Sequence, residues 1–210
     1  MIKNILFDLD GTLTDSSEGV IKCSLYAFSH YGIEVPKDKL NTLIGPPLRY
    51  SFALYGVPEN EIENALSRYR ERYKTVGKFE NRPYNNIEKV LAALKAAGHR
   101  LYVATSKPES LSVEILDHFN LSQYFDAICG ATFDTSRDSK EAVIRYLLET
   151  QKCDGEIIMV GDTVFDVEGA SAVGIPTICV GWGFGEKTEL LAAGAVKIAD
   201  TMEELLDMLI

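Results

Sequence analysis

The sequence predicts an α/β protein with a doubly wound parallel sheet and an inserted all-helical domain. The chain opens with a short apolar run, Ile5–Phe7, that stops at acidic residues. From residue 84 onward, helical patterns alternate with further short apolar runs, which favours a parallel sheet. Between these parts, residues 16–80 carry helical patterns and no convincing strand. We therefore expect an α/β core formed by residues 1–15 and 84–210, with a helical domain at 16–83.

The first strand ends in a pair of acids. Ile5, Leu6 and Phe7 read as a buried strand, and Asp8-Leu9-Asp10-Gly11-Thr12 follows it. Glycine and threonine break the extended pattern, so both acids are expected at the carboxyl end of the strand, where open α/β sheets place their ligands. The alternative is a solvated turn after an edge strand. The large apolar residues before the acids disfavour that alternative.

The inserted domain is expected to contain helices joined by glycine and proline turns. Asp15 is a candidate N-cap for the first helix, with Glu18 placed for a capping box, and Gly32 is a candidate stop. Further helices are expected at Pro36–Ile44, Leu48–Tyr55 and Glu59–Thr75.

The second half of the core has a regular order of elements. An alanine- and leucine-rich helix is expected over 85–97, stopped by Gly98. Short apolar runs predict the remaining strands, which are expected at 101–104, 125–129, 157–160, 177–180 and 196–198. Helices between them complete the strand–helix alternation.

Composition narrows the class of function. The chain has 210 residues and a net charge of -10, which argues against a surface for nucleic acid or for an anionic membrane. The acidity also means that an anionic substrate needs local cations or a metal. Four widely spaced cysteines, no signal peptide and no apolar run of transmembrane length favour a cytoplasmic protein with reduced thiols. The sequence does not define an oligomeric state.

Polar residues follow the second strand and open the next helices. Thr105-Ser106-Lys107-Pro108 could bind an anion through a hydroxyl and nearby N–H groups, although a simple N-cap is at least as good an explanation. Lys140 lies at a helix start, where a cation opposes the helix dipole. Taken alone, it reads as a solvated lysine.

The last motif, Gly161-Asp162 followed by Asp166, comes after the buried run 157–160. Asp162 could be an N-cap. Together with Asp8 and Asp10, however, it would complete an oxygen-rich site suited to Mg²⁺, a hard cation that prefers carboxylates and carbonyls.

This ordered set of four motifs, spanning residues 8–166, resembles the haloacid dehalogenase superfamily of phosphohydrolases. The resemblance implies a Rossmann-like core and a mobile helical cap with hinges around residues 15–16 and 82–83. It also implies Mg²⁺-dependent hydrolysis of a small phosphorylated metabolite through an aspartyl-phosphate.

The resemblance assigns a role to each motif. Asp8 would be the nucleophile and Asp10 the general acid and base. Mg²⁺ would be held by Asp8, the backbone carbonyl of Asp10 and Asp162, with Asp166 in support. The residues expected to contact the phosphoryl group are Asp8, Leu9, Asp10, Thr105, Ser106 and Lys140.

Two loops indicate a subgroup. Gly45-Pro46-Pro47-Leu48 is similar to a loop of phosphoglycolate phosphatases and of a 5′-nucleotidase-like branch, and Gly181–Glu186 looks most like the latter. That second loop could equally be local packing around Trp182 and Phe184. The candidates for leaving-group contacts are Pro47, Arg49, Lys107 and Trp182.

Three rivals remain to be weighed. Asp10 disfavours a dehalogenase, which does not need that acid. A sugar phosphomutase of this family would carry a histidine where this chain has Val20. A non-enzymatic phospho-accepting signalling domain also uses a strand-end aspartate, but it needs neither Asp10 nor a helical insertion.

Overall fold

The chain divides into two compact units. The computed structural model describes residues 2–44, 48–134 and 136–210. The core unit comprises Met1–Asp15 and Pro83–Ile210, and the helical unit comprises Ser16–Arg82. The second boundary thus lies one residue before the position expected from the sequence.

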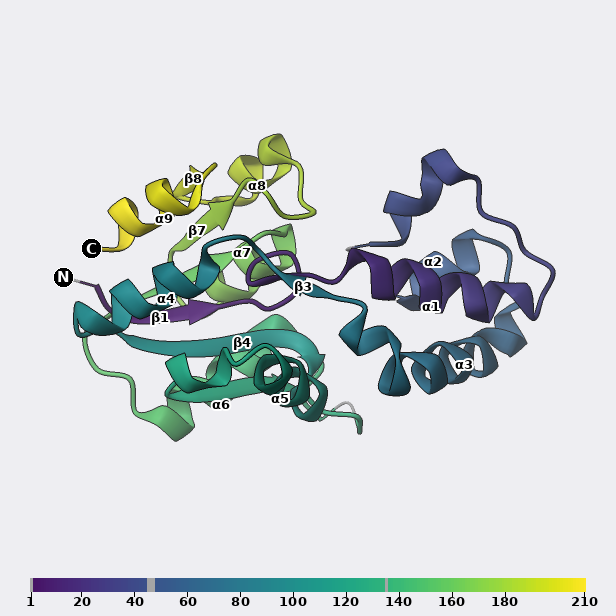
Figure 1. Cartoon of the computed structure of the whole chain (residues 1–210), viewed down its shortest axis with the longest axis horizontal. Helices are drawn as coiled ribbons and strands as arrows, with labels where there is room; N and C mark the ends of the chain where they lie inside the picture. Colours follow the sequence, from purple (N-terminus) through teal and green to yellow (C-terminus); the bar gives the residue numbers. More distant parts are fainter. Residues whose placement is uncertain (1, 45–47, 135) are drawn as a thin grey trace. The chain divides into compact units, whose positions relative to one another are not determined.

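The core unit is built on a six-stranded parallel sheet with the strand order β5-β4-β1-β6-β7-β8. Figure 1 labels β4, β1, β7 and β8 of this sheet. The first strand in the chain lies inside the sheet, and strands are added outward from it on both sides. This confirms the doubly wound parallel sheet predicted from the sequence. The strands are β1 Ile2–Phe7, β4 Arg100–Pro108, β5 Ala127–Ala131, β6 Glu156–Gly161, β7 Thr177–Val180 and β8 Lys197–Ala199.

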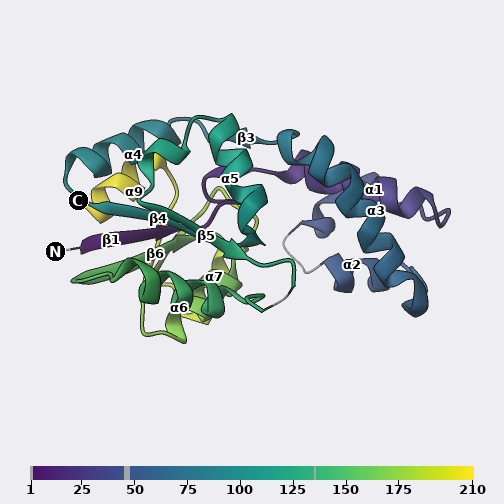
Figure 2. The ribbon, with the colours of Figure 1, turned by 90° about the horizontal axis from the view of Figure 1, so that it is seen from below.

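β1 is buried on both faces because its side chains alternate between two hydrophobic clusters. Ile5 and Phe7 pack in one cluster with α4, α5 and α9, whereas Leu6 packs in the other with α6 and α7. Figure 2 shows these two sets of helices on opposite faces of the sheet. A continuous apolar run is what a parallel strand covered on both faces requires. The helices of the core unit are α4 Ile87–Ala96, α5 Glu109–His118, α6 Lys140–Gln151, α7 Val164–Ser171, α8 Lys187–Ala193 and α9 Met202–Leu209, with a 3-10 turn at Ser122–Tyr124.

The helical unit packs around aromatic side chains. Phe28 lies 5.0 Å from Phe52 and Phe52 lies 6.3 Å from Tyr69, measured between ring centroids. Residues 16–44 and 48–80 contain no strand. The elements of this unit are α1 Ser17–Ser29, α2 Leu48–Leu54 and α3 Ile62–Thr75, with 3-10 helices at Lys37–Leu43, Glu59–Glu61 and Gly77–Phe79. Where the chain passes between units, β2 (Thr14–Asp15) pairs with β3 (Arg82–Pro83).

Several element ends differ from the sequence prediction. Asp15 is not the N-cap of α1, because it ends β2 and Ser16 occupies the cap position. Three consecutive residues here, Asp15, Ser16 and Ser17, all suit a cap, so the pattern could not choose among them. β4 continues past Ala104 to Pro108, because its pairing with β5 resumes after a shift in register.

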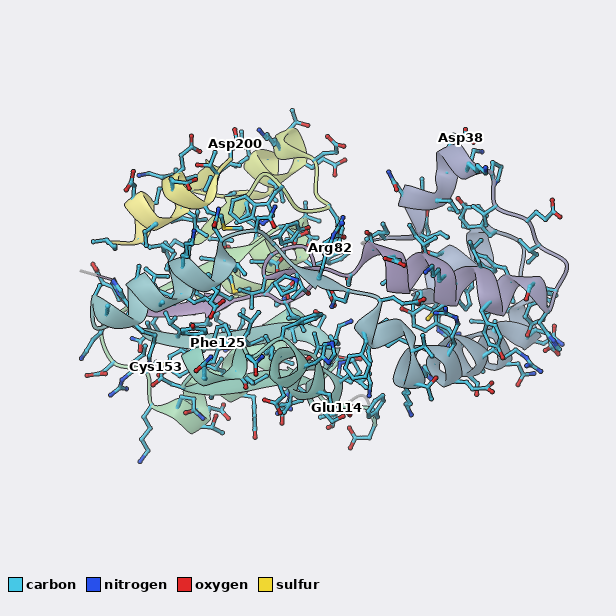
Figure 3. All side chains as sticks on the ribbon, viewed as in Figure 1. Asp38, Arg82, Glu114, Phe125, Cys153 and Asp200 are labelled. Atoms are coloured by element: carbon cyan, nitrogen blue, oxygen red, sulfur yellow. The ribbon has the colours of Figure 1, made fainter. Side chains whose placement is uncertain are left out.

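All four cysteines are free thiols, as the spacing predicted. Cys23, Cys129 and Cys179 are buried, and Cys153 is partly exposed just before β6 (Figure 3). Within the described residues, no helix combines the length and apolar character needed to span a membrane.

Candidate active site

The candidate site lies at the carboxyl edge of the sheet, where β1 ends. The Asp8 N–H donates to the carbonyl of Val160 at 2.9 Å, so Asp8 is the last residue held in the ladder. The chain then turns sharply, and the carbonyl of Leu9 accepts from the N–H groups of both Leu13 and Thr14. Gly11 adopts φ +84 in this turn, a conformation that favours glycine. The turn leaves Asp8 almost buried, with 8% of its surface exposed.

β6 delivers the next acids beside Asp8. Phe7 pairs with Val160 in the sheet, so Asp8 and Gly161 emerge side by side. Thr163 is the N-cap of α7, and Asp166 accepts from the Thr163 N–H at 3.0 Å in a capping box. The cap position therefore belongs to Thr163 and not to Asp162, whose side chain is fully buried at the sheet edge.

Three carboxylates gather at this edge. One oxygen atom each from Asp8, Asp162 and Asp166 lies within 4.8 Å of the others. An amine lies beside two of them: Lys140 Nζ is 2.8 Å from Asp8 Oδ1 and 2.7 Å from Asp166 Oδ1. It also donates to the carbonyl of Ala104 at 2.9 Å. Ser139 caps α6, and Lys140 is buried, which excludes the solvated first-turn lysine.

The electrostatics of this cluster favour a bound cation. Burial raises the pKa of Asp8 to about 6, against the pull of Lys140 and with added repulsion from Asp166. Burial likewise raises the pKa of Asp162, and Asp166 and Asp8 add to the rise. For Lys140 burial acts in the opposite direction, but the carboxylates of Asp166 and Asp8 outweigh it and raise its pKa. Lys140 thus pairs with Asp8 and Asp166 in a cluster of three buried acids, and these residues suit a hard divalent cation bound by oxygen atoms.

The end of β4 supplies a second group of polar residues. Because Phe7 also pairs with Val103, Thr105 emerges on the other side of Asp8. Thr105 is buried and Ser106 is exposed, while Pro108 holds the N-cap position of α5, so neither hydroxyl is spent on capping that helix. Lys107 Nζ lies 2.8 Å from Asp10 Oδ2. Lys107, one of the candidates for leaving-group contacts, therefore forms an ion pair with Asp10, two residues after the candidate nucleophile Asp8.

The other specificity candidates are placed differently. The Trp182 indole N–H donates to the Thr12 carbonyl at 3.3 Å, and its ring centroid lies 6.2 Å from that of Tyr84. Arg49 is an exposed residue of α2 and pairs with Glu63 within the helical unit. Pro47 lies outside the described residues.

Sequence reasoning missed two partners of Asp162. Thr12 Oγ1 donates to Asp162 Oδ1 at 3.0 Å, and the Phe184 N–H donates to Asp162 Oδ2 at 2.9 Å. The hydroxyl that directly follows Gly11 in the first motif was a usable signal for Thr12. A backbone donor from a glycine-rich loop leaves no such signal, because it depends on the path of the loop and not on a side chain.

The fold and the acid-lined sheet edge define a hydrolase of the haloacid dehalogenase type, and comparison with known proteins agrees. Residues 5–180 match the haloacid dehalogenase-like hydrolase family. The chain belongs to this family, and the resemblance inferred from the four motifs is confirmed.

Similar proteins from several bacteria are named as enzymes that act on phosphate esters or transfer phosphoryl groups. The chain is 44% identical over 192 residues to a 5′-nucleotidase of Pseudomonas aeruginosa, covering 90% of this chain and 87% of the relative. It is 40% identical over 209 residues to the tyrosine-protein kinase PtkA of Mycobacterium tuberculosis, covering 98% and 72%. It is 35% identical over 191 residues to a phosphoglycolate phosphatase of Agrobacterium fabrum, covering 85% and 80%.

A solved structure extends the likeness to the whole fold. A predicted phosphatase from Clostridium acetobutylicum is 43% identical, superposes with a TM-score of 0.92 and matches 99% of this chain and 98% of its own. The expectation of an enzyme of the phosphatase type is confirmed by these relatives.

Proposed function

We propose that the protein hydrolyses small-molecule phosphate monoesters, depends on Mg²⁺ and proceeds through an aspartyl-phosphate on Asp8. One observation carries the proposal. A strand-end carboxylate lies against a buried amine at 2.8 Å and shares an oxygen-lined cluster with Asp162 and Asp166. A carboxylate held in this way can act as a nucleophile whose charge is offset locally.

In the first half of the reaction, an oxygen of Asp8 forms a bond to phosphorus as the ester oxygen leaves. Asp10 gives that oxygen a proton. In the second half, Asp10 takes a proton from water, which attacks phosphorus and releases phosphate and free Asp8. Thr105 and the Ser106 N–H hold phosphoryl oxygens, alongside the backbone of Leu9, while Lys140 offsets their negative charge.

Mg²⁺ would be held by Asp8, Asp162 and the backbone carbonyl of Asp10, with Asp166 in support. When bound, it supplies positive charge that lets a carboxylate approach a phosphate dianion. Asp166 fits the supporting role because one of its oxygens accepts from Thr163 and the other pairs with Lys140. Such outer contacts hold ligands in place and adjust the affinity for the metal.

We further propose that residues 16–83 act as a cap for a catalytic core of 1–15 and 84–210. Closure would exclude water and bring specificity residues to the leaving group. Pro47, Arg49, Lys107 and Trp182 stay the candidates for these contacts. The names of the relatives point to phosphoglycolate or a nucleoside monophosphate as substrate.

Phosphate release from p-nitrophenyl phosphate tests the nucleophile. Asp8→Asn should lower turnover by more than about 10⁴-fold, because the amide oxygen is a poor nucleophile. Asp38→Asn is the matched control, since Asp38 is an exposed residue of the helical unit and should leave turnover unchanged. Wild-type turnover in Asp8→Asn would refute the proposal. A panel of phosphoglycolate, nucleoside monophosphates, sugar phosphates and pyrophosphate, compared by kcat/KM, then identifies the substrate class.

A second candidate is favoured by the likeness to PtkA over 98% of this chain. The same phosphorylated aspartate could pass its phosphoryl group to a hydroxyl acceptor in place of water. Incubation with labelled nucleoside triphosphate and a tyrosine-containing peptide separates the two. Label on tyrosine without free phosphate supports transfer, whereas rapid multiple-turnover release of phosphate supports hydrolysis. A long-lived phosphoprotein without either product would indicate a signalling domain.

A further inference from the structure

The loop after β7 encloses Asp162 more tightly than local packing requires. Its residues Gly181-Trp182-Gly183-Phe184-Gly185 connect β7 to α8. The Phe184 N–H donates to Asp162 Oδ2 at 2.9 Å, and the Gly185 N–H donates to the Asp162 carbonyl at 3.1 Å. The loop therefore grips both the side chain and the backbone of one acid.

Three glycines are needed for this fit. A Cβ on Gly183 would overlap Cβ of Asp162, one on Gly185 would overlap its carbonyl oxygen, and one on Gly11 would overlap Oδ2. Gly11 belongs to the turn after β1, whereas the other two belong to the loop after β7. We call these three residues the glycine collar. The backbone of two separate segments thus lies so close to Asp162 that a residue with a Cβ would not fit at any of these three positions.

The two segments of the collar are also tied to each other. Trp182 donates from Nε1 to the carbonyl of Thr12 at 3.3 Å, and Thr12 Oγ1 donates to Asp162 Oδ1 at 3.0 Å. Each carboxylate oxygen of Asp162 thus has one fixed donor, and the two donors come from segments that are bonded together. Rotation of this carboxylate would break one of these bonds in a fully buried setting, which is costly.

We infer that the glycine collar and Trp182 are positioning residues that fix the Asp162 carboxylate for the divalent cation, and thereby set the affinity for Mg²⁺. The inference rests on the metal role of Asp162 under the proposed function. It assigns residues 182–185 of this loop to the metal centre, by contacts through Asp162 and Thr12, and it gives Trp182 a role beyond local packing. Loss of an outer contact to a metal ligand typically weakens binding of the metal by about 10–100-fold.

Calorimetric titration of the metal-free protein with Mg²⁺ provides the test. Gly183→Ala should weaken Mg²⁺ binding by about 10–100-fold, because the new methyl group displaces the carboxylate. Gly181→Ala is the matched control in the same loop. Its Cβ would meet the side chains of Asp200 and Lys187, which are exposed and can rotate away, so its Mg²⁺ affinity should stay within about 2-fold of wild type.

A second variant and a folding measurement keep the inference falsifiable. Trp182→Phe keeps an aromatic ring but loses the indole N–H and its hydrogen bond to the Thr12 carbonyl. This variant should weaken Mg²⁺ binding by about 3- to 10-fold. The melting temperature in EDTA reports on folding alone and should change little in Trp182→Phe. Wild-type Mg²⁺ affinity in either Gly183→Ala or Trp182→Phe would overturn the inference. If Gly183→Ala does not fold, Trp182→Phe decides.

Asp162→Asn separates this inference from the proposed function on which it rests. If that variant loses Mg²⁺ binding while Gly183→Ala and Trp182→Phe keep it, the collar inference alone fails. If Asp162→Asn binds Mg²⁺ as wild type does, the assigned metal ligands are wrong and the collar inference falls with them.

Discussion

Two acids separated by one residue, Asp8 and Asp10, lie in contrasting electrostatic settings. Asp8 is buried with Asp162 and Asp166, and the amine of Lys140 pairs with Asp8 and Asp166. Asp10 pairs with Lys107, whose Nζ lies 2.8 Å from Asp10 Oδ2, and the Asp10 side chain is 26% exposed. The first setting holds an excess of negative charge in fixed positions, as a cation site requires. The second is balanced and open to solvent, as a group that exchanges protons with water requires.

The largest effect that sharpens this contrast is expected from Asp10→Asn. Loss of a general acid and base typically costs about 10²–10⁴-fold. With an alkyl phosphate we expect the phosphoenzyme barely to form, because the leaving oxygen receives no proton. With p-nitrophenyl phosphate, whose leaving group needs no proton, we expect a phosphoenzyme that persists. Intact-mass measurement after mixing shows whether one phosphoryl group accumulates, and normal turnover would remove Asp10 from its role.

Lys140→Met removes the amine that pairs with Asp8 and Asp166. We expect kcat/KM to fall by about 10²–10³-fold, because the charge that faces the phosphate is lost. The variant also leaves buried carboxylates without their amine, so its free energy of unfolding in EDTA at pH 7 should drop by about 3–5 kcal/mol. Urea denaturation measures this drop. A change below about 1 kcal/mol would show that the ion pairs of Lys140 contribute little to folding.

The pH dependence of stability tests whether Asp8, Asp162 and Asp166 together hold more negative charge than Lys140 offsets. Because burial raises the pKa of Asp8 from 3.8 to about 6, the native state binds more protons than the unfolded state in between. The contribution of Asp8 to stability should therefore fall as pH rises from about 4 to 6, so the metal-free wild type should lose stability relative to Asp8→Asn across this window. Wild-type stability that rises relative to Asp8→Asn between these pH values would contradict the assignment.

Mg²⁺ should reverse this trend, because its carboxylate ligands must be deprotonated. At a concentration of about 100 times the dissociation constant, Mg²⁺ should raise the melting temperature by about 5–10 °C at pH 7.5. At pH 5 the increase should be much smaller. Thermal melts with and without Mg²⁺ at the two pH values give the comparison, and equal increases would argue that Asp8 is not a ligand.

Lys107→Met makes the same substitution on the Asp10 side and should have the smallest effect. A single ion pair of a partly exposed carboxylate contributes about 1 kcal/mol or less, so we expect a similarly small loss of stability. We expect kcat/KM to fall by less than about 10-fold. Parallel activity assays and urea denaturation of Lys140→Met and Lys107→Met compare their losses of kcat/KM and of free energy of unfolding. Equal losses in both variants would erase the contrast between the two settings.

The sequence was enough to predict which strand ends meet, but not which side chains pair there. Parallel strands share a carboxyl edge, so Asp8 and Asp162 could be brought together by topology, whereas Lys140 was placed beside them only by the family resemblance. The pairing of Lys107 with Asp10 could not be predicted, because a long flexible side chain can reach several acids. The bond from Trp182 to Thr12 was also beyond prediction, since it joins residues 170 positions apart through a backbone carbonyl.

Element types were likewise easier to predict than their ends. The apolar run before Asp8 can be buried only inside a sheet covered on both faces, and β1 lies there. The start of α1 depended on competition among neighbouring residues that are all good caps, and Asp15 was the wrong choice. The end of β4 depended on a register shift against β5, which no local pattern records.

The position of β1 inside the sheet also orders the events of synthesis. Its partners begin at residues 100 and 156, so its ladder cannot close until most of the chain has left the ribosome. The helices of residues 16–82 contact one another over shorter sequence distances than β1 and its partners, so they can form earlier. The emerging polypeptide therefore carries Asp8, the proposed nucleophile, from the start, but the cluster that Asp8 forms with Asp162 and Asp166 cannot assemble until Asp166 has left the ribosome.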